Sequence, residues 1–192
     1  FLTLWNAYRF YVQYANLDGL NPHDVAVGDG STPIDRWLRS RLHVVVRTVG
    51  QSLEAYDLPT VVRIVEEFFD DLSNWYVRLN RRRFWKNLHD GDKAAAHVTL
   101  YEALTTLTRL MAPVVPFLAE EIYQDLVHCV CPDGPESVHL CAYPVAQEEL
   151  IDDGLMADMS RVRQVVTAGR AVRASQNLKV RQPLAQVLVV AD

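Results

Sequence analysis

Apolar residues recur at steps of three and four along most of the chain, which is the period of an α-helix with one buried face. The longest such run starts at Pro59, a residue suited to the first turn of a helix, and reaches Lys86. We therefore predict one helix over residues 59–86. Asn74 lies among its large side chains and is predicted to be a buried amide with satisfied hydrogen bonds. The predicted inward residues are Val65, Phe68, Phe69, Leu72, Trp75, Tyr76 and Leu79.

The same period predicts further helices, separated by breaks that contain Gly, Pro or Asp. The clearest start is at Thr32, which can cap a helix that has Pro33 in its first turn and Asp35 at the acidic position of a capping box. In the last helix we predict a buried face made of Met159, Val162, Val165, Val166 and Val172. The predicted helices cover residues 1–16, 33–56, 59–86, 93–111, 117–129 and 152–175.

The connecting segments complete the predicted fold. Residues 17–32 and 131–147 are predicted loops, the second with an extended stretch at 137–141. Gln186–Val190 is rich in β-branched residues and is predicted to be a strand. We therefore expect an all-α helical bundle with a short strand-like appendage at its C-terminal end. We assign residues 1–147 to the bundle, and 148–192 to a C-terminal helix, a basic loop and the start of a truncated further unit.

Length and composition limit the class of protein. The chain has 192 residues, of which 49% are hydrophobic, so it can bury a core. No apolar run approaches the roughly 20 residues that span a bilayer, and we expect no membrane partner. The chain opens at Phe1 within an apolar helical pattern and without a start Met, so we expect a piece of a longer protein.

The cysteines bear on both compartment and metal binding. Their number, three, is odd, which is typical of a reduced intracellular protein, and we expect the cytoplasm. They could be grouped with two histidines around a metal, but their C-x-C spacing differs from the usual spacing of zinc ligands. We therefore predict buried free thiols and no metal site. The residues concerned are His128, Cys129, Cys131, His139 and Cys141.

Charge is unevenly distributed along the chain. The net charge is −5, which by itself argues against a nucleic-acid partner. However, residues 78–86 hold five of the 19 Lys and Arg residues, residues 161–181 hold six, and neither stretch contains an acid. We call these stretches the first and second basic islands. A partner responds to the local field rather than to the sum, so a polyanion is compatible with this acidic chain.

The spacing within the first basic island favours a nucleic acid. Arg78, Arg82 and Lys86 form one row of the predicted helix, and Arg81 and Trp85 form a neighbouring row. Cations favour a helix C-terminus, but one or two satisfy the dipole and this end has five. An exposed Trp could stack on a base, whereas the alternative is a core Trp beside Phe84. The arginines of residues 33–56 are predicted to be solvated; they are Arg36, Arg39, Arg41 and Arg47.

No pattern in the sequence supports catalysis. Acidic pairs occur at Glu66-Glu67, Asp70-Asp71 and Glu120-Glu121, but each is predicted to lie on a helix surface without a His or a nucleophile beside it. Ser73 and Ser175 lack any signature of a catalytic triad. We therefore predict no catalytic residue in these 192 residues.

Two long motifs resemble one family closely. Leu72–Trp85 reads LSNWYVRLNRRRFW and Asn177–Leu184 reads NLKVRQPL, and both resemble segments of isoleucyl-tRNA synthetases. Leu4–Phe10, LWNAYRF, is similar to the stretch that follows the catalytic core in that family. Met111–Tyr123, MAPVVPFLAEEIY, is similar to a stretch shared by the valyl, leucyl and isoleucyl enzymes. Together the motifs cover nearly the whole chain.

The resemblance implies an α-helical anticodon-binding domain that binds the anticodon arm of tRNA(Ile). The parent enzyme would use ATP and Mg²⁺ in a catalytic core on the same chain. No cofactor is expected here, because HIGH-type and KMSKS-type motifs and a Gly-rich phosphate loop are absent from the sequence. Two alternatives remain: the valyl enzyme, and a helical module whose basic face binds an acidic protein.

On this hypothesis each basic island has a role. The cations of the first island contact phosphates, or one of them reads a base, and Trp85 stacks on an unstacked base. The second island supplies further backbone contacts or is merely a solvated face. The candidate tRNA-binding residues are Arg78, Arg81, Arg82, Arg83, Trp85, Lys86, Arg163, Arg170, Arg173, Lys179 and Arg181.

Overall fold

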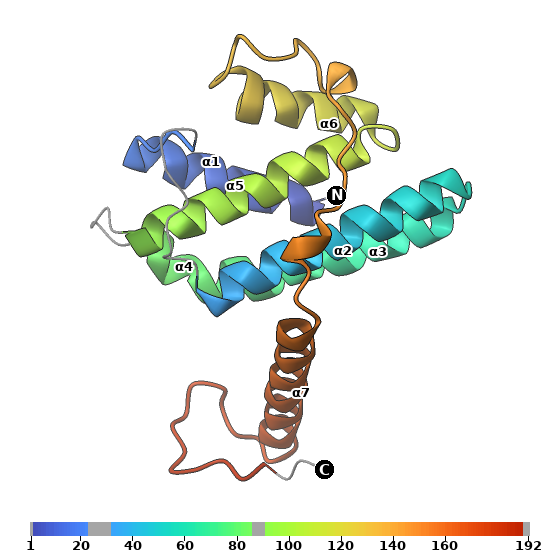
Figure 1. The fold of residues 1–192 in the computed structure, drawn as a ribbon. Coiled ribbons are helices and arrows are strands. Elements are labelled where there is room, and N and C mark those ends of the chain that lie inside the picture. Colours follow the sequence, from blue (N-terminus) through green and yellow to red (C-terminus); the bar gives the residue numbers. More distant parts are fainter. Residues whose placement is uncertain (1, 23–31, 86–90, 190–192) are drawn as a thin grey trace. The chain divides into compact units, whose positions relative to one another are not determined.

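Helices make up the regular structure of the part of the chain that the computed structural model describes, residues 2–22, 32–85 and 91–189 (Figure 1). No strand occurs within these ranges, so the prediction of an all-α fold is confirmed. The elements are α1 (Leu2–Asp18), α2 (Pro33–Glu54), α3 (Leu58–Asp70), the π-helix η1 (Asp71–Val77), α4 (Arg78–Trp85), α5 (Gly91–Met111), α6 (Pro116–Tyr123), the π-helix η2 (Gln124–His128), the 3₁₀-helices η3 (Val138–Leu140) and η4 (Glu148–Leu150), and α7 (Asp153–Ser175).

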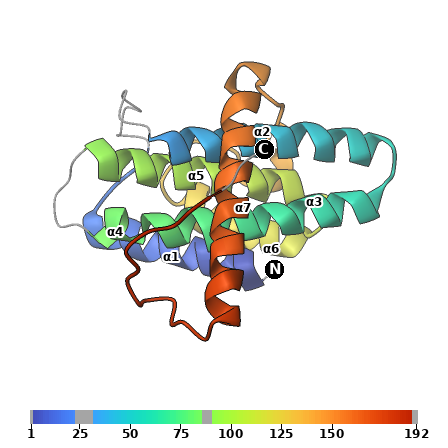
Figure 2. The same cartoon turned by 90° about the horizontal axis from the view of Figure 1, so that it is seen from below.

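The chain divides into two compact units, residues 1–151 and residues 152–192. In the first unit α5 is the central helix, because it contacts α1, α2, α4 and α6. Figure 2 shows the same unit from below. Ala96, Leu100, Leu104 and Leu107 of α5 are fully buried, as expected of a helix surrounded by others. The functional division that we predicted at residue 147 stays a prediction.

The start of α2 follows the predicted capping box. The Thr32 backbone N–H and hydroxyl both donate to Asp35 Oδ2, at 2.9 and 2.7 Å. Along α2, the predicted inward residues Leu38, Leu42 and Val45 are buried. The prediction that the arginines of α2 are solvated is wrong for Arg39 and Arg41, which are half-buried and pair with Glu102 and Asp71, each at 2.8 Å. Arg36 and Arg47 are exposed as predicted, although Arg47 also pairs with Glu148 at 2.7 Å.

The predicted long helix of residues 59–86 is continuous in the described residues but not uniform. Its middle, η1, is a π-helix between α3 and α4, a change of hydrogen-bond pattern that apolar spacing does not predict. The buried face is mostly as predicted, with Val65, Phe68, Phe69, Leu72 and Tyr76 inside. Leu79, predicted inward, is 54% exposed. The predicted end at Lys86 lies outside the described residues.

The segment that follows α6 is held to it by polar contacts. Glu120 Oε2 accepts hydrogen bonds from the Ser137 hydroxyl at 2.8 Å and from the Val138 N–H at 3.0 Å. The Tyr123 hydroxyl donates to the Pro135 carbonyl at 2.8 Å. The stretch at 137–141 that we predicted to be extended contains the 3₁₀-helix η3 instead. This stretch is therefore helical rather than extended where Val138 donates a hydrogen bond to Glu120.

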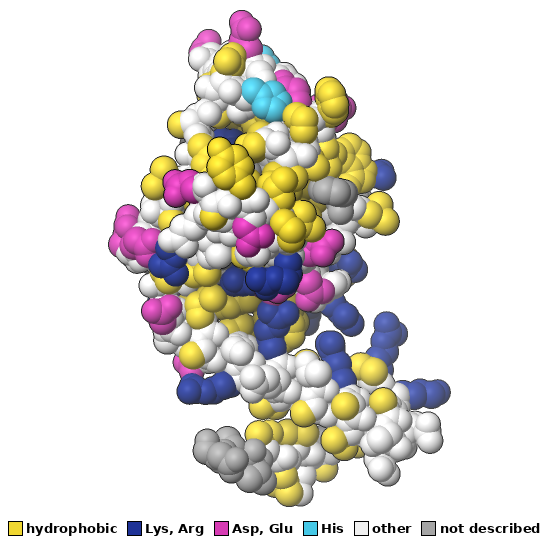
Figure 3. Space-filling model, turned by 90° about the vertical axis from the view of Figure 1, so that its right-hand side faces the viewer, with side chains coloured by type: hydrophobic (Ala, Val, Ile, Leu, Met, Phe, Trp, Pro, Cys, Tyr) yellow, Lys and Arg dark blue, Asp and Glu magenta, His cyan; other side chains and the backbone are white. Residues whose placement is uncertain are grey.

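The second unit consists of α7 and the segment after it. The span of α7 matches the prediction, and Asp152 caps it by accepting a hydrogen bond from the Leu155 N–H at 2.9 Å. The predicted buried face is wrong, because no residue of α7 is buried. Val172 is 63% exposed, and Figure 3 shows hydrophobic side chains at the surface of this unit.

Asn177 ends α7 in a left-handed conformation with φ +53°. The Leu178 N–H donates to the Arg173 carbonyl at 2.9 Å and the Asn177 N–H to the Ala174 carbonyl at 3.1 Å, which is the Schellman pattern. Asn tolerates this conformation better than most residues. The strand predicted at 186–190 does not form at residues 186–189, and Val190 lies outside the described residues.

Across residues 2–22, 32–85 and 91–189, no helix is both long enough and apolar enough to span a membrane.

Candidate nucleic-acid interface

The helix α4 has two sharply different faces. Asn80, Arg83 and Phe84 are buried at 4, 8 and 1% exposure, and they are spaced i, i+3 and i+4. Phe84 provides the apolar anchor, because its ring packs edge-on against Phe10 at 5.1 Å and against His97 of α5 at 4.8 Å between ring centroids. This packing places the opposite side of α4 toward solvent.

The exposed face of α4 is a stripe of cations that ends in an aromatic ring. Arg78, Arg81, Arg82 and Trp85 are spaced i, i+3, i+4 and i+7, so they lie along one side of the helix, and all four are exposed. Within the described ranges, none of the three arginines pairs with an acidic side chain. Trp85 is 55% exposed, which excludes the core position that was the alternative for it. We call these four residues the α4 stripe.

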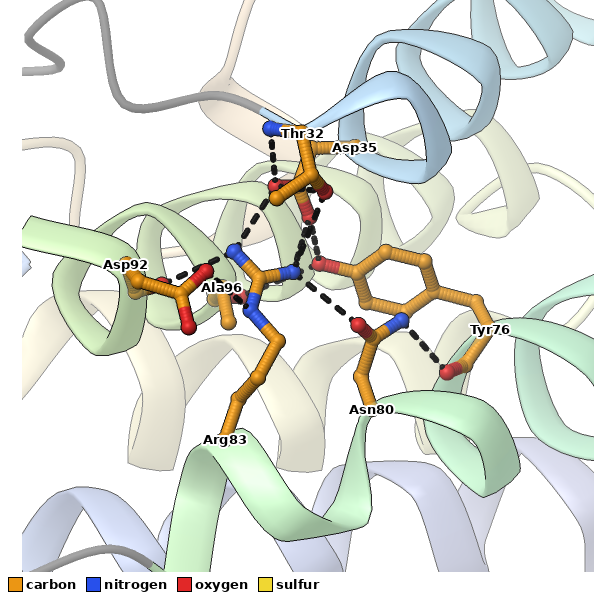
Figure 4. Close-up of polar contacts among 7 residues, drawn as sticks. All are labelled: Thr32, Asp35, Tyr76, Asn80, Arg83, Asp92 and Ala96. Carbon is orange, nitrogen blue, oxygen red and sulfur yellow. Dashed lines mark hydrogen bonds and ion pairs between the residues drawn. The ribbon is translucent and has the colours of Figure 1, made fainter.

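Arg83 does not belong to the α4 stripe, contrary to the sequence prediction. Its Nη1 and Nη2 donate to Asp35 Oδ1 and Oδ2, both at 2.8 Å, so the two groups form a forked ion pair (Figure 4). Arg83 Nε pairs with Asp92 Oδ1 at 2.8 Å, and Nη2 also donates to the Asp92 carbonyl at 2.8 Å. With its guanidinium so engaged, Arg83 is not on the exposed face of α4.

Other polar groups complete this buried cluster. The Tyr76 hydroxyl donates to Asp35 Oδ1 at 2.6 Å, and Arg83 Nη1 donates to Asn80 Oδ1 at 3.0 Å. Asn80 also donates through its Nδ2 to the Tyr76 carbonyl at 2.8 Å. We call Thr32, Asp35, Tyr76, Asn80, Arg83 and Asp92 together the Arg83 network.

The electrostatics of the Arg83 network follow from burial and pairing. Burial alone would raise the pKa of Asp35, but hydrogen bonds from Arg83, Tyr76 and Thr32 outweigh it and hold this pKa below its ordinary 3.8. Burial and the neighbouring Asp35 raise the pKa of Tyr76 well above its usual range. Asp35 is therefore an ionised acceptor and Tyr76 a neutral donor at neutral pH.

The buried amide of the helical stretch from α3 to α4 is Asn80, not Asn74 as the sequence predicted. Asn74 is exposed and donates to Asp70 Oδ1 at 2.6 Å, one turn back along the helix. A signal for Asn80 was present, because a step of four from the inward Tyr76 leads to Asn80 and a second step leads to Phe84. No pattern in the sequence showed that Asp35 and Asp92 would meet Arg83.

The second basic island is arranged differently. Arg170, Lys179 and Arg181 are exposed, and Arg163 is half-buried. Arg173, predicted to contact tRNA, donates through Nη1 to the Lys179 carbonyl at 3.0 Å and to the Gln182 carbonyl at 2.8 Å. Arg173 thus holds the basic loop against the end of α7 through its guanidinium. Lys86 of the first island lies outside the described residues.

The acidic and sulfur-containing candidates serve the fold. Among the acidic pairs, Glu67 pairs with Arg63 at 2.9 Å and Asp71 with Arg41 at 2.8 Å, while Glu120 binds the segment after α6. The cysteines are free thiols, but none is buried as predicted: Cys129 is exposed, and Cys131 and Cys141 are half-buried. In the described part of the chain, no three His, Cys, Asp or Glu side chains are grouped as metal ligands would be.

Comparison with known proteins matches this chain to one family. Residues 35–189 match the family described as "Anticodon-binding domain of tRNA ligase". An isoleucine–tRNA ligase from Dehalococcoides mccartyi is 48% identical over 190 residues, which are 98% of this chain and 19% of that protein. The isoleucine–tRNA ligase of Thermus thermophilus is 47% identical over 192 residues, 100% of this chain and 18% of that protein. One from Streptomyces avermitilis is 47% identical over 189 residues, 98% of this chain and 18% of that protein. The chain therefore spans about a fifth of the length of these relatives.

Proposed function

Because this chain belongs to the anticodon-binding domain family of tRNA ligases, we propose that it binds the anticodon arm of tRNA(Ile) as part of an isoleucine–tRNA ligase. The observation that carries the proposal is the α4 stripe, where three arginines without acidic partners in the described ranges lie beside an exposed Trp on one face of a packed helix. Cations attract the phosphate backbone, and an aromatic ring can stack on a base of a single-stranded loop.

The α4 stripe divides the work between affinity and recognition. Arg78, Arg81 and Arg82 contact phosphates, which supplies affinity and sets the register without reading sequence. Trp85 stacks on a base that is unstacked in the anticodon loop. A further phosphate contact is proposed for Lys86, which lies outside the described residues. The second basic island adds backbone contacts through Arg163, Arg170, Lys179 and Arg181.

The catalytic reaction takes place elsewhere in the proposed ligase. A catalytic core on the same chain joins isoleucine to tRNA(Ile) with ATP and Mg²⁺, in the cytoplasm, and the 192 residues hold no cofactor. In support, one carboxylate of each acidic pair described above, Glu67, Asp71 or Glu120, is engaged in an ion pair or hydrogen bond of the fold. The role proposed for this chain is to bring the anticodon end of the right tRNA into a defined position.

The test is the salt dependence of tRNA(Ile) binding by the whole ligase. Log–log slopes change by about 0.7 to 0.9 for each phosphate contact, so R78A/R81A/R82A is expected to flatten the slope by about 2. A matched control, R9A/R36A/R63A, removes three other exposed arginines of the first unit and is expected to leave the slope nearly unchanged. Equal slopes for the two triple variants would refute the assignment to the α4 stripe.

Two further measurements address the alternatives. The relatives carry the name isoleucine–tRNA ligase, which favours tRNA(Ile) over tRNA(Val), and parallel binding to both tRNAs tests that preference. An acidic peptide offered in excess tests for a protein partner. If the peptide displaced tRNA(Ile) at matched charge, the α4 stripe would be a general polyanion surface rather than a tRNA site.

A further inference from the structure

The Arg83 network lies where α4 ends and where α2 and α5 begin. Arg83 is in the last turn of α4, Asp35 is in the first turn of α2, and Asp92 is in the first turn of α5. Its guanidinium reaches both carboxylates, with ion-pair distances of 2.8 Å to each (Figure 4). One side chain therefore sets the distance between the end of α4 and two neighbouring helices.

The shape of the contact also sets the rotation of α4. The guanidinium is planar, and its two Nη atoms meet the two oxygens of Asp35 in parallel while Nε faces Asp92. A single point charge would satisfy the Coulomb attraction from many orientations, but a fork permits few. Arg82 precedes Arg83 by one residue and the rest of the α4 stripe lies on the same exposed side. A rotation of α4 would move all four residues of the stripe together.

The first turn of α5 is held from a second side as well. Lys93, next to Asp92, is 1% exposed, and its Nζ pairs with Asp18 Oδ2 at the end of α1 at 2.6 Å. His97 Nε2 lies 3.2 Å from the same oxygen. The first turn of α5, to which Arg83 connects α4, is thus itself fixed to α1. A displaced Arg83 would not be followed by a matching shift of α5.

We propose that Arg83 and Asp35 are positioning residues for tRNA binding, which hold α4 in the rotation that presents Arg78, Arg81, Arg82 and Trp85 to RNA. The proposal rests on the proposed function. A buried ion pair is a poor source of net stability compared with apolar packing, and Phe84 already supplies such packing on the same face. What the forked pair adds is a defined orientation.

The binding of variants distinguishes this positioning role from a direct contact between Arg83 and RNA. If Arg83 bound a phosphate, D35N would release it and leave binding intact, and R83K would keep most of the affinity. If Arg83 positions α4, D35N and R83M each weaken tRNA(Ile) binding about tenfold, and R83K does not rescue because it lacks the fork. The double variant D35N/R83M then loses no more than either single variant, since both remove the same contact.

Two further variants, R39M as a control and Y76F as a milder change, test whether weaker binding merely reflects a general loss of folding. R39M breaks the ion pair between Arg39 of α2 and Glu102 of α5, which is also 2.8 Å long but does not touch α4. It is expected to leave tRNA affinity within twofold of the wild type. Y76F removes one hydrogen bond to Asp35 Oδ1 and is expected to weaken binding two- to threefold. All affinities are measured on the whole ligase at a temperature where circular dichroism shows each variant fully folded.

Hydrogen exchange by mass spectrometry gives a second readout that needs no RNA. In R83M and D35N, peptides from α4 and from the first turn of α2 are expected to exchange at least tenfold faster, and in R39M the α4 peptide is expected to match the wild type. Unchanged exchange in α4 would overturn the proposal whatever the tRNA result. Faster exchange with unchanged affinity would also overturn it. Failure of the wild-type ligase to bind tRNA(Ile) would instead refute the proposed function.

Discussion

The two basic islands look alike in sequence but are supported differently. In the first, Arg78, Arg81 and Arg82 project from α4, whose other face is buried through Asn80, Arg83 and Phe84. In the second, most cations project from α7, in which no residue is buried, or from the loop after it. In the first unit the backbone beneath the cations is fixed by packing and by the Arg83 network, whereas in the second it is fixed by the local hydrogen bonds of one helix end.

This difference shows what a run of cations can and cannot imply. A run creates a local positive field wherever it lies, so either island can attract a polyanion. A fixed arrangement is needed to match particular phosphates and to stack a ring on a particular base. Only the first island has buried groups on the same helix that set such an arrangement. We therefore expect substitutions to separate the islands in stability, in salt dependence and in response to pH.

The largest expected difference concerns the support itself. F84A removes a ring that is 1% exposed and should lower the free energy of unfolding by about 3–5 kcal/mol. V162A on α7 removes methyl groups from a side chain that is 50% exposed and should change it by less than about 0.5 kcal/mol. Urea unfolding followed by circular dichroism measures both. A loss in V162A as large as that in F84A would mean that α7 is covered.

The next difference concerns how much an ion pair in each unit contributes to the free energy of unfolding, and how acidic pH changes that contribution. D35N leaves Arg83 buried without its charged partner and should cost about 3 kcal/mol, whereas D158N breaks the exposed Arg161–Asp158 pair and should cost less than about 0.5 kcal/mol. Because the pKa of Asp35 is held below 3.8 in the folded chain, its stabilisation is complete above that pH and is lost as the pH falls further. The gap between wild type and D35N should therefore close in acid. Unfolding free energies measured from pH 7 down to pH 2 would show a constant gap if this reasoning were wrong.

A smaller difference is expected in tRNA binding. R170A/K179A/R181A removes three exposed cations of the second island and should flatten the salt slope by about 1, roughly half the effect expected for R78A/R81A/R82A. The reason is that cations fixed only by the local hydrogen bonds of one helix end form their phosphate contacts only part of the time. Slopes for both variants of the whole ligase, measured against tRNA(Ile), decide the order. A reversed order would make the second island the main site.

The smallest effect concerns His43. Burial lowers the pKa of His43, which lies in the first unit, from its ordinary 6.5. The unfolded chain then binds a proton first, so stability falls as the pH drops below 6.5. H43Q keeps an acceptor for the Gln147 N–H, whose hydrogen bond His43 Nδ1 accepts at 3.2 Å, and should reduce this fall. Thermal unfolding between pH 7.5 and 5 measures the change, and parallel curves for the two proteins would contradict it.

The sequence predicted the helices well because their spans follow from local signals. Apolar spacing and breakers located α2, α5 and α7 within two residues at each end, and the capping box at Thr32 formed as predicted. The buried face of α7 failed for a physical reason. Spacing shows which residues share a face, but not whether another element covers that face.

The candidate site could be predicted in outline only. Three consecutive arginines, Arg81 to Arg83, have the same local chemistry, and only the rotation of the helix decides which of them is buried. That rotation was open to inference from Tyr76 and Phe84, but the acids that receive Arg83 come from α2 and α5 and are separated from it by 48 and 9 positions. Contacts between distant segments are set by the tertiary arrangement, which local spacing does not contain.

The π-helix η1 has a consequence for how this surface tolerates changes of length. Its seven residues, Asp71–Val77, precede α4 directly. An α-helix advances by about 100° per residue, so deleting one residue while this wide turn kept its hydrogen-bond pattern would rotate everything downstream by more than a quarter of a circle. Arg83 would then take the exposed position that Arg82 now holds, and Phe84 would take the buried position of Arg83. The number of residues before the arginines, as much as their identity, thus decides which of them RNA can meet.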